Sequence, residues 1–252
     1  MTLDAIILSD LHLGSANCQS KDLCTFLEGV AEGAPAIERL ILNGDLFDSF
    51  DFRRLKKSHW KVLSLLRRLS DQIEITWMCG NHDGSAEIIS HLLGVTVRDE
   101  YVFRSGGRDV LVLHGHVFDE FITAHPILTW IGDCIYALLQ CIDGTHTIAR
   151  LAKRGSKTFV RCVKKIQEGS IKYAREKGCS AVCCGHTHAA AANEQGPIAY
   201  YNSGCWTEWP GSYLTATHGH IQLEHFSSEI HEGTPEPNGA DEEPPVLQLT
   251  GS

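Results

Sequence analysis

The sequence predicts a layered α/β fold. Over the first 115 residues, short apolar runs alternate with segments whose apolar positions recur at helical spacing. Polar motifs that contain Asp, Asn and His follow several apolar runs, as they do at strand ends in α/β proteins. The composition agrees with a buried core, because 43% of the residues are hydrophobic and 21% are charged. Together these observations predict sheet strands inside and helices outside.

The predicted strands are apolar runs bounded by polar residues and turns. In the first part of the chain they are residues 5–8, 40–42, 73–78 and 110–113. Helical spacing is found between them at residues 21–31, 53–69 and 85–93. Strands are expected again at residues 181–184, 198–201, 213–217 and 220–226. A chain of 252 residues suits one domain with an insertion, and we expect that domain to span residues 1–226.

Residues 117–178 differ from the rest and are predicted to form a helical cap inserted into the domain. The first half of this segment is apolar with helical character, and the second half is basic. Residues 150–177 contain ten Lys and Arg against two Glu, a net charge of +8. An apolar helix beside a basic one is suited to a lipid that carries phosphate, or to an anionic membrane surface. The same pattern is as typical of a packing face next to a solvated face.

Much of the net charge of −9 lies in residues 227–252, which contain six Asp and Glu and no Lys or Arg. This acidic tail, rich in Pro and Gly, is expected to be disordered. Neither a signal peptide nor a transmembrane segment is visible. We therefore expect a cytoplasmic protein that can contact the inner membrane face peripherally through the cap. Its ten cysteines are expected to be reduced and mostly buried.

Five short motifs carry the chemistry, and each follows a predicted strand. They are Asp10-Leu-His12, Gly44-Asp45, Gly80-Asn81-His82-Asp83, His114-Gly-His116 and Gly185-His186-Thr-His188. Carboxylate, imidazole and amide groups together suit Mn, Fe or Zn rather than ions that prefer thiolates. The two oxygens of Asp45 can bridge two ions. Each motif alone is a weak signal, but all five in this order predict a site for two divalent metal ions.

The ordered motifs resemble those of the calcineurin-like metallophosphoesterase superfamily, over about residues 4–225. The resemblance implies a four-layer αββα sandwich of two mixed sheets. It also implies two ligand sets that share one carboxylate. The first set would be Asp10, His12, Asp45 and His188, and the second Asp45, Asn81, His114 and His186. Two such ions hold the phosphoryl group and provide the metal-bound hydroxide that attacks phosphorus.

The resemblance also gives His82 a catalytic role, because the superfamily has a histidine that is not a ligand at this place. We expect it to donate a proton to the leaving oxygen or to stabilise the transition state. Asp83 is expected either to orient His82 or to cap the helix that follows. His116 is a candidate substrate contact, although it could equally support the ligands or face away from them.

Longer matches narrow the resemblance to the UDP-2,3-diacylglucosamine pyrophosphohydrolase group of lipid A synthesis, in its histidine-bearing branch. These matches are residues 8–14, 43–48, 114–119 and 202–208. They imply a lipid-linked nucleotide as substrate, with Mn as the expected ion. The best-known branch has Arg in place of His82, and an Asp is common in place of His116, so the exact reaction stays open. The candidate substrate contacts are Asn43, His116, Lys153, Arg154, Lys157 and Arg161.

Other functions are compatible with the same motifs. The metal site would be identical in a phosphodiesterase or phosphatase for another lipid, a nucleotide or a small phosphoester. A non-catalytic scaffold is disfavoured, because such scaffolds usually lose ligands or the histidine at position 82. A nuclease could use the +8 segment for phosphate contacts, but the chain lacks an interleaved aromatic platform for stacked bases.

Overall fold

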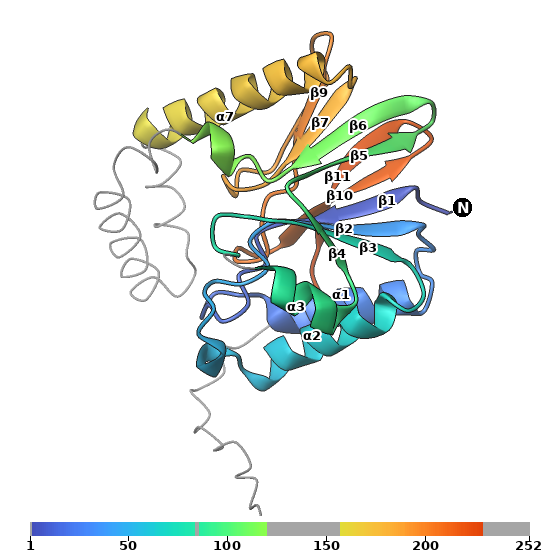
Figure 1. Cartoon of the computed structure of the whole chain (residues 1–252), viewed down its shortest axis with the longest axis vertical. Helices are drawn as coiled ribbons and strands as arrows, with labels where there is room; N and C mark the ends of the chain where they lie inside the picture. The colour runs from blue at the N-terminus through green and yellow to red at the C-terminus, as the bar shows by residue number, and fades with distance from the viewer. Residues whose placement is uncertain (1, 84–85, 120–156, 229–252) are drawn as a thin grey trace, which may run out of the picture.

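Two mixed β-sheets lie face to face at the centre of the structure (Figure 1). The computed structural model describes residues 2–83, 86–119 and 157–228. The first sheet contains, in spatial order, β11 (His220–Phe226), β10 (Gly211–Thr217), β1 (Ala5–Leu8), β2 (Arg39–Asn43), β3 (Glu74–Met78) and β4 (Thr96–Arg98). The second contains β5 (Glu100–Ser105), β6 (Arg108–Leu113), β7 (Ala181–Cys184), β9 (Ala199–Asn202) and β8 (Ala191–Asn193).

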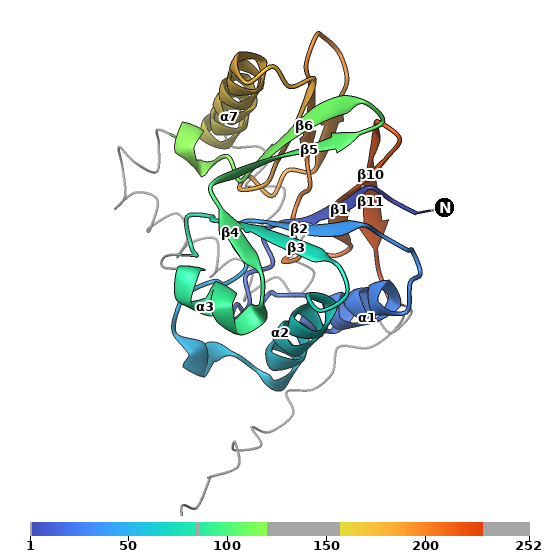
Figure 2. The ribbon, with the colours of Figure 1, turned by 45° about the vertical axis from the view of Figure 1, so that its right-hand side comes forward.

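Helices cover the outer face of each sheet (Figures 1 and 2). The first sheet is covered by α1 (Ser20–Ala31), α2 (Lys57–Leu69) and α3 (Ala86–Leu93), and the second by α7 (Lys157–Glu176). Two short 3-10 helices, η1 (Phe52–Arg54) and η2 (His116–Phe118), lie in loops. This order of layers confirms the αββα sandwich of two mixed sheets.

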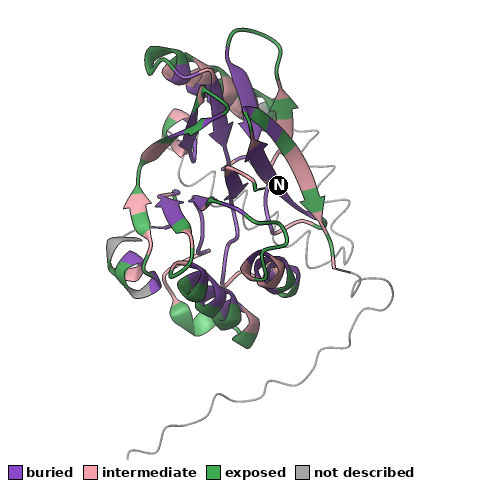
Figure 3. Cartoon of the chain, turned by 90° about the vertical axis from the view of Figure 1, so that its right-hand side faces the viewer, coloured by how far each residue is buried: buried purple, intermediate pink, exposed green. Residues whose placement is uncertain are grey.

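The inner strands are buried on both faces, which explains their continuous apolar sequences. Along β1, Ile6 and Leu8 pack with residues of α1 and α2, whereas Ile7 belongs to the cluster between the sheets. A third cluster, which includes Val182 and Ala174, lies between the second sheet and α7. Figure 3 shows the buried strands inside and the exposed outer faces of the helices. Burial of each large apolar side chain contributes about 1.5–3 kcal/mol, so the three clusters together fix the layers.

The parallel strands determine where a functional site can lie. β1, β2 and β3 are parallel to one another, and so are β6, β7 and β9. Both sets end at the same edge of the sandwich, on the left of Figure 1. Loops from six strands therefore meet at one edge, where ligands bind in α/β folds.

The predicted helix over residues 53–69 is two elements in the structure. The chain first forms η1, where the Asp51 carboxylate accepts a hydrogen bond from the Arg53 N–H (3.3 Å). Leu55 is then extended and buried, and α2 begins at Lys57. The apolar residues keep a helical spacing through the whole segment, but the backbone at the buried Leu55 is extended. One continuous helix is therefore not formed.

Three strands have no counterpart among the predicted ones. β4, β5 and β8 all lie at sheet edges. β4 and β8 have three residues each and no fully buried position, and β5 begins with three positions that are not buried. Edge strands of this kind carry little apolar periodicity, which is the main signal for a strand.

α7 confirms a helix in the second half of the segment predicted as a cap. Its residues Ile166 and Ala174 are wholly buried, and Ala174 packs against the second sheet, so this helix forms the fourth layer. Residues 120–156 of the predicted cap and residues 229–252 of the tail lie outside the described residues, and both remain predictions. Among the helices that the structure describes, none is both long and apolar enough to cross a bilayer. The eight cysteines of the described residues form no disulfide with one another.

Candidate metal centre

Residues of all five motifs lie on loops at the edge where the parallel strands end. β1 is followed by Asp10 and His12, and β2 by Asp45. These two loops run side by side, because the N–H groups of Asp10 and His12 donate to the carbonyls of Gly44 and Asp45, both at 3.0 Å. β3, β6 and β7 lead in the same way into the other three motifs. The backbone therefore brings residues that are far apart in sequence to one place.

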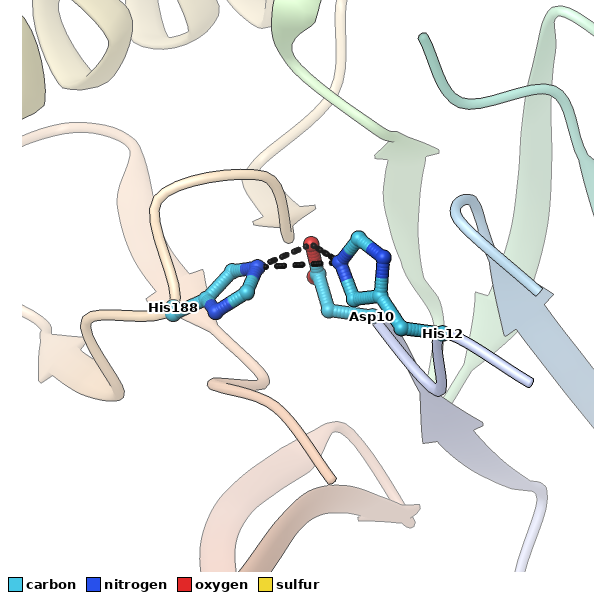
Figure 4. A group of neighbouring side chains, drawn as sticks. All are labelled: Asp10, His12 and His188. Atoms are coloured by element: carbon cyan, nitrogen blue, oxygen red, sulfur yellow. Dashed lines mark hydrogen bonds and ion pairs between the residues drawn. The ribbon is translucent and has the colours of Figure 1, made fainter. Parts of the chain in front are cut away.

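Asp10, His12 and His188 form one compact group (Figure 4). Their candidate ligand atoms lie within 4.8 Å of one another. His188 Nε2 is 3.2 Å from both His12 Nε2 and Asp10 Oδ1, and the last two atoms are 3.9 Å apart. The three side chains point toward one another from the loops after β1 and β7. One carboxylate and two imidazoles at this separation can bind one divalent ion.

Asp45 belongs to two further groups of candidate ligands. One contains His12 and His82, and the other contains His114 and His186, again with ligand atoms within 4.8 Å. Asp45 Oδ2 lies 3.7 Å from His12 Nε2 and 3.4 Å from His114 Nε2. A carboxylate between two imidazoles is placed as a bridging ligand would be, which is the position that its sequence motif predicts.

Asn81 lies at the exposed rim of the same centre. Its neighbour His82 donates its backbone N–H to Asp45 Oδ1 at 2.9 Å, which ties the loop after β3 to the loop after β2. The structure thus brings the seven expected ligand residues to one edge, and their use as ligands remains a prediction. These residues are Asp10, His12, Asp45, Asn81, His114, His186 and His188.

The donor atoms of the centre fit a bound cation. Asp10 Oδ1 and His114 Nε2 are buried and make no hydrogen bond within the described residues, although each lies within ion-pair distance of a neighbouring candidate ligand. Nearly all buried polar atoms in proteins have a hydrogen-bond partner, so such atoms need another kind of partner. A set of carboxylate and imidazole groups matches Mn, Fe or Zn, which is the chemistry that the calcineurin-like motifs imply.

Two glycines of the motifs allow the backbone to approach the candidate ligands closely. A Cβ atom on Gly44 would lie 2.2 Å from His114 Nδ1, and a Cβ atom on Gly80 would lie 2.1 Å from Asp45 Oδ1. No side chain fits at either distance. Glycine is therefore required at both positions for the ligands to lie where they do.

Five of the candidate ligands have a left-handed backbone conformation. Their φ angles are 55° for Asp10, 46° for His12, 52° for Asp45, 65° for His186 and 56° for His188. For a residue with a Cβ atom this conformation is rare and costs about 1 kcal/mol or more. Such conformations concentrate at functional sites, where the surrounding structure holds them in place.

Asp83 joins two loops of the centre. Its buried carboxylate accepts hydrogen bonds from the backbone N–H groups of Asp45 (2.7 Å), Gly80 (2.9 Å) and Phe47 (3.2 Å), and from Trp77 Nε1 (3.1 Å). Burial, together with the negative charge of Asp45, raises its pKa to about 6. Its carboxylate thus binds the loops after β2 and β3 together and supports the centre, while the two roles expected from sequence remain predictions.

His82 is exposed beside the candidate ligands. Its Nδ1 lies 3.0 Å from the carbonyl of Asp48, which holds the ring, and its ring centroid is 5.0 Å from that of His12. The carboxylate of Asp48 lies 3.8 Å from His12 Nδ1 and 2.6 Å from Arg54 Nη1. Asp48 therefore contacts two histidines of the centre, although the motif pattern assigns it no role.

Burial disfavours the charged forms of the Asp and His side chains of the centre. Whether the pKa of each group is finally raised or lowered depends on the charges of its neighbours. Burial would raise the pKa of Asp10, but His188 lowers it to about 2. Burial and the charge of His188 lower the pKa of His12 to about 4. Burial would also lower the pKa of His114, yet the negative charge of Asp45, 3.4 Å away, raises it to about 9. His114 and Asp45 therefore form an ion pair at neutral pH, and a cation must displace the proton of His114.

The expected substrate contacts occupy different places. Asn43 is wholly buried, and its carbonyl accepts a hydrogen bond from His114 Nδ1 (2.8 Å), so its position indicates support of His114 rather than contact with substrate. His116 is partly buried, with its ring centroid 5.5 Å from that of His114. Lys157 and Arg161 are exposed on the first turns of α7, at the metal edge. Lys153 and Arg154 lie outside the described residues.

Asp119 and Asn202 also contact the centre and were not among the expected site residues. Asp119 Oδ2 lies 3.1 Å from His186 Nε2. Asn202 Nδ2 donates to the carbonyl of Gly185 at 2.7 Å and so holds the loop that carries His186. A sequence signal existed for both, because each stands in one of the longer segments that carry the family resemblance.

Comparison with known proteins agrees with this geometry. The sequence model of the calcineurin-like phosphoesterase family matches residues 4–190, which is most of the chain. A UDP-2,3-diacylglucosamine hydrolase from Edwardsiella ictaluri is 27% identical over 204 residues, 74% of this chain and 76% of the relative. Among solved structures, an archaeal phosphodiesterase (13% identical) covers 88% of this chain and 98% of its own, with a TM-score of 0.47. The phosphoesterase Yfce from E. coli (16% identical) covers 88% and 99%, also with a TM-score of 0.47. The chain therefore belongs to the calcineurin-like phosphoesterase family and is a metal-dependent phosphoesterase.

Proposed function

We propose that the chain hydrolyses phosphoesters with two divalent ions held by the ligand sets that share Asp45. The observation that carries this proposal is the position of Asp45 Oδ2, within 3.7 Å of His12 Nε2 and 3.4 Å of His114 Nε2. A carboxylate oxygen close to an imidazole of each ligand set is what a pair of ions with a shared ligand would need. The remaining ligands would be Asp10 and His188 on one side, and Asn81 and His186 on the other.

The residues around the ions would have distinct roles. Bound divalent ions supply charge neutralisation at phosphorus and an activated water near neutral pH. His82 is exposed beside the ligands, and we assign it the proton donor to the leaving oxygen. The carbonyl of Asp48 holds Nδ1 of this ring and so limits its rotation. Asp83, first expected to be catalytic, would act through the backbone of Asp45 as a positioning residue.

For the substrate we propose a lipid-linked nucleotide of the UDP-2,3-diacylglucosamine type, cleaved by water within its diphosphate. The support is the 27% identical hydrolase, which shares three quarters of its length with this chain. The exposed Lys157 and Arg161 are suited to contact a diphosphate or an anionic membrane surface from α7. Mn is the proposed ion, and the inner face of the membrane is the proposed place of action.

The test is hydrolysis of UDP-2,3-diacylglucosamine with added Mn²⁺, run beside bis-p-nitrophenyl phosphate and p-nitrophenyl phosphate. Asp45→Ala is the negative control, and Asp71→Ala, which removes an exposed carboxylate from the turn after α2, is its matched control. Fast cleavage of the lipid nucleotide with slow turnover of the small esters is the expected result. Metal-dependent turnover of the small esters alone would contradict the proposed substrate. It would still agree with a metal-dependent phosphoesterase.

The contribution of α7 can be tested separately. Arg161→Glu should raise KM for the lipid nucleotide about tenfold or more, because it places a like charge near the phosphates. Lys172→Glu reverses a charge of the same kind near the other end of the same helix. It should leave KM unchanged. Equal effects of the two variants would indicate a general charge effect rather than a local contact.

A further inference from the structure

Asp119 is a buried carboxylate that contacts the candidate centre from outside both ligand sets. It follows η2 and is 6% exposed. Its Oδ2 lies 3.1 Å from Nε2 of His186. An ionised carboxylate can only accept hydrogen bonds, so at this distance the shared proton belongs to Nε2 of the imidazole.

A proton on Nε2 decides which nitrogen of His186 can bind a cation. Neutral imidazole has one N–H group and one lone pair, so the lone pair is then on Nδ1. His114 shows the same arrangement with the nitrogens exchanged. Its Nδ1 donates to the carbonyl of Asn43 at 2.8 Å, and its Nε2 faces Asp45. Both histidines of the Asp45 group thus have one nitrogen held by an acceptor of the protein.

We propose that Asp119 is a positioning residue of the metal centre, which holds the Nε2–H of His186 so that Nδ1 binds the ion shared with Asp45 and His114. This inference rests on the proposed function in one respect, namely that the centre binds two ions. Metal-bound histidines very often donate their second N–H to a carboxylate, which fixes the ring and increases its basicity. Loss of such a partner typically costs 10–100-fold in metal affinity.

The backbone of His186 is held independently of Asp119. Its N–H donates to Asp10 Oδ2 at 3.0 Å, and the preceding carbonyl, of Gly185, accepts from Asn202 Nδ2 at 2.7 Å. These bonds fix the loop, but they do not themselves set the orientation of the imidazole. The contact with Asp119 limits that rotation, so its loss should loosen the ligand without unfolding the loop.

α7 offers a matched control, because its Cys162 contacts the same oxygen of Asp119. Cys162 Sγ lies 3.0 Å from Asp119 Oδ2, and a thiol is a weak donor. Cys162→Ala therefore removes a partner of Asp119 without touching His186. If Asp119 acts on the metal through His186, loss of the cysteine should have little effect on metal binding.

The test is calorimetric titration of the metal-free full chain with Mn²⁺, for the wild type, Asp119→Ala, Asp119→Asn and Cys162→Ala. Two binding steps are expected for the wild type. Asp119→Ala should weaken one step about 10–100-fold and leave the other within about twofold. Asparagine keeps an oxygen acceptor at the same place, so Asp119→Asn should restore most of the lost affinity. Cys162→Ala should resemble the wild type in both steps.

Thermal unfolding of the metal-free variants separates this role from a structural one. The unfolding temperature of Asp119→Ala should stay close to that of Cys162→Ala. The proposal is wrong if Asp119→Ala binds both ions like the wild type, or if both steps weaken together with the unfolding temperature. Equal losses in Asp119→Ala and Asp119→Asn would also overturn it, because a direct ligand rather than an acceptor for His186 would then be indicated.

Failure of the proposed function has a different signature. If the wild-type chain binds two ions but does not cleave the lipid nucleotide, the proposed substrate is wrong. The proposed role of Asp119 then still stands. A wild-type chain with a single binding step would overturn both the two-ion centre and the role of Asp119.

Discussion

The Asp83 carboxylate accepts the backbone N–H of Asp45 at 2.7 Å, so a residue of the third motif holds the bridging candidate of the second. The same oxygen also accepts the N–H of Gly80, within its own motif. Two loops that follow neighbouring strands are thereby joined behind the metal centre. The arrangement explains why Asp83 is wholly buried although it lies in a polar loop.

Asp83→Ala should destabilise the whole protein. The substitution leaves four donors without their acceptor, namely Trp77 Nε1 and the N–H groups of Asp45, Phe47 and Gly80. Each buried unsatisfied donor costs about 1–3 kcal/mol, and entry of water offsets part of this cost, so we expect a loss of about 3–5 kcal/mol in the free energy of unfolding. Urea denaturation measures it. Asp71→Ala, which removes an exposed carboxylate, should leave stability nearly unchanged, and equal effects would contradict our account.

Asp45→Ala and His82→Ala should separate a ligand from a proton donor. Asp45→Ala removes the carboxylate shared by both ligand sets, so metal binding and turnover should be lost together. His82→Ala should keep the metal content and reduce turnover about 10²–10⁴-fold. Metal analysis of the purified variants, beside kcat for each, makes the comparison. Equal loss of metal in both would refute the separation, since it would make His82 a ligand.

Gly44→Ala should disrupt the centre, whereas Gly107→Ala should not. The two glycines have similar φ angles of 85° and 81°, so alanine has the same backbone cost of about 1 kcal/mol at both. Only at Gly44 would the new Cβ meet His114 Nδ1, at 2.2 Å, whereas at Gly107 it would meet nothing within 4 Å. Mn²⁺ titration and urea denaturation of both variants would measure the difference. Similar metal affinity in the two would show that the close approach to His114 is unimportant.

Metal affinity should rise with pH up to the pKa of His114. This pKa is raised to about 9, because Asp45 outweighs the effect of burial, so His114 carries a proton at neutral pH in the metal-free protein. An ion that uses His114 must displace this proton, and its apparent affinity should increase about tenfold per pH unit between about pH 7 and 9 and then level off. Titrations in buffers of different ionisation enthalpy would count the released protons. An affinity that is flat over this range would contradict the prediction.

The sequence predicted the inner strands better than the edges, for a physical reason. β1 and β7 are buried on both faces, so their sequences are continuous apolar runs. β4 and β8 are short edge strands without a fully buried position. Their pairing depends on neighbours brought by the rest of the fold, which local periodicity does not record.

Some features of the candidate site were also easier to predict from the sequence than others. Spacing and residue type predicted the ligands, because Asp and His directly after buried strands must meet at one edge. The direction of a side chain was not predictable. Asp83 follows His82 in sequence, yet its carboxylate accepts the backbone N–H of Asp45 on the loop after β2, and Asn43 is wholly buried, with its side-chain amide toward the carbonyl of Cys183. Asp119 was missed because its partner His186 is 67 residues away and comes from another strand.

The left-handed conformation of the five candidate ligands lowers the stability of the fold at the residues that hydrolysis needs. Glycine adopts this conformation freely, so replacing His12, His186 or His188 by glycine would relieve about 1 kcal/mol of backbone strain at each position. Asp10 and Asp45 differ, because their carboxylates also accept backbone N–H groups that would lose a partner. A lineage that no longer needs hydrolysis therefore gains stability most readily by discarding the histidine ligands. Attempts to engineer a hardier enzyme should leave these five positions alone and look to the helical layers instead.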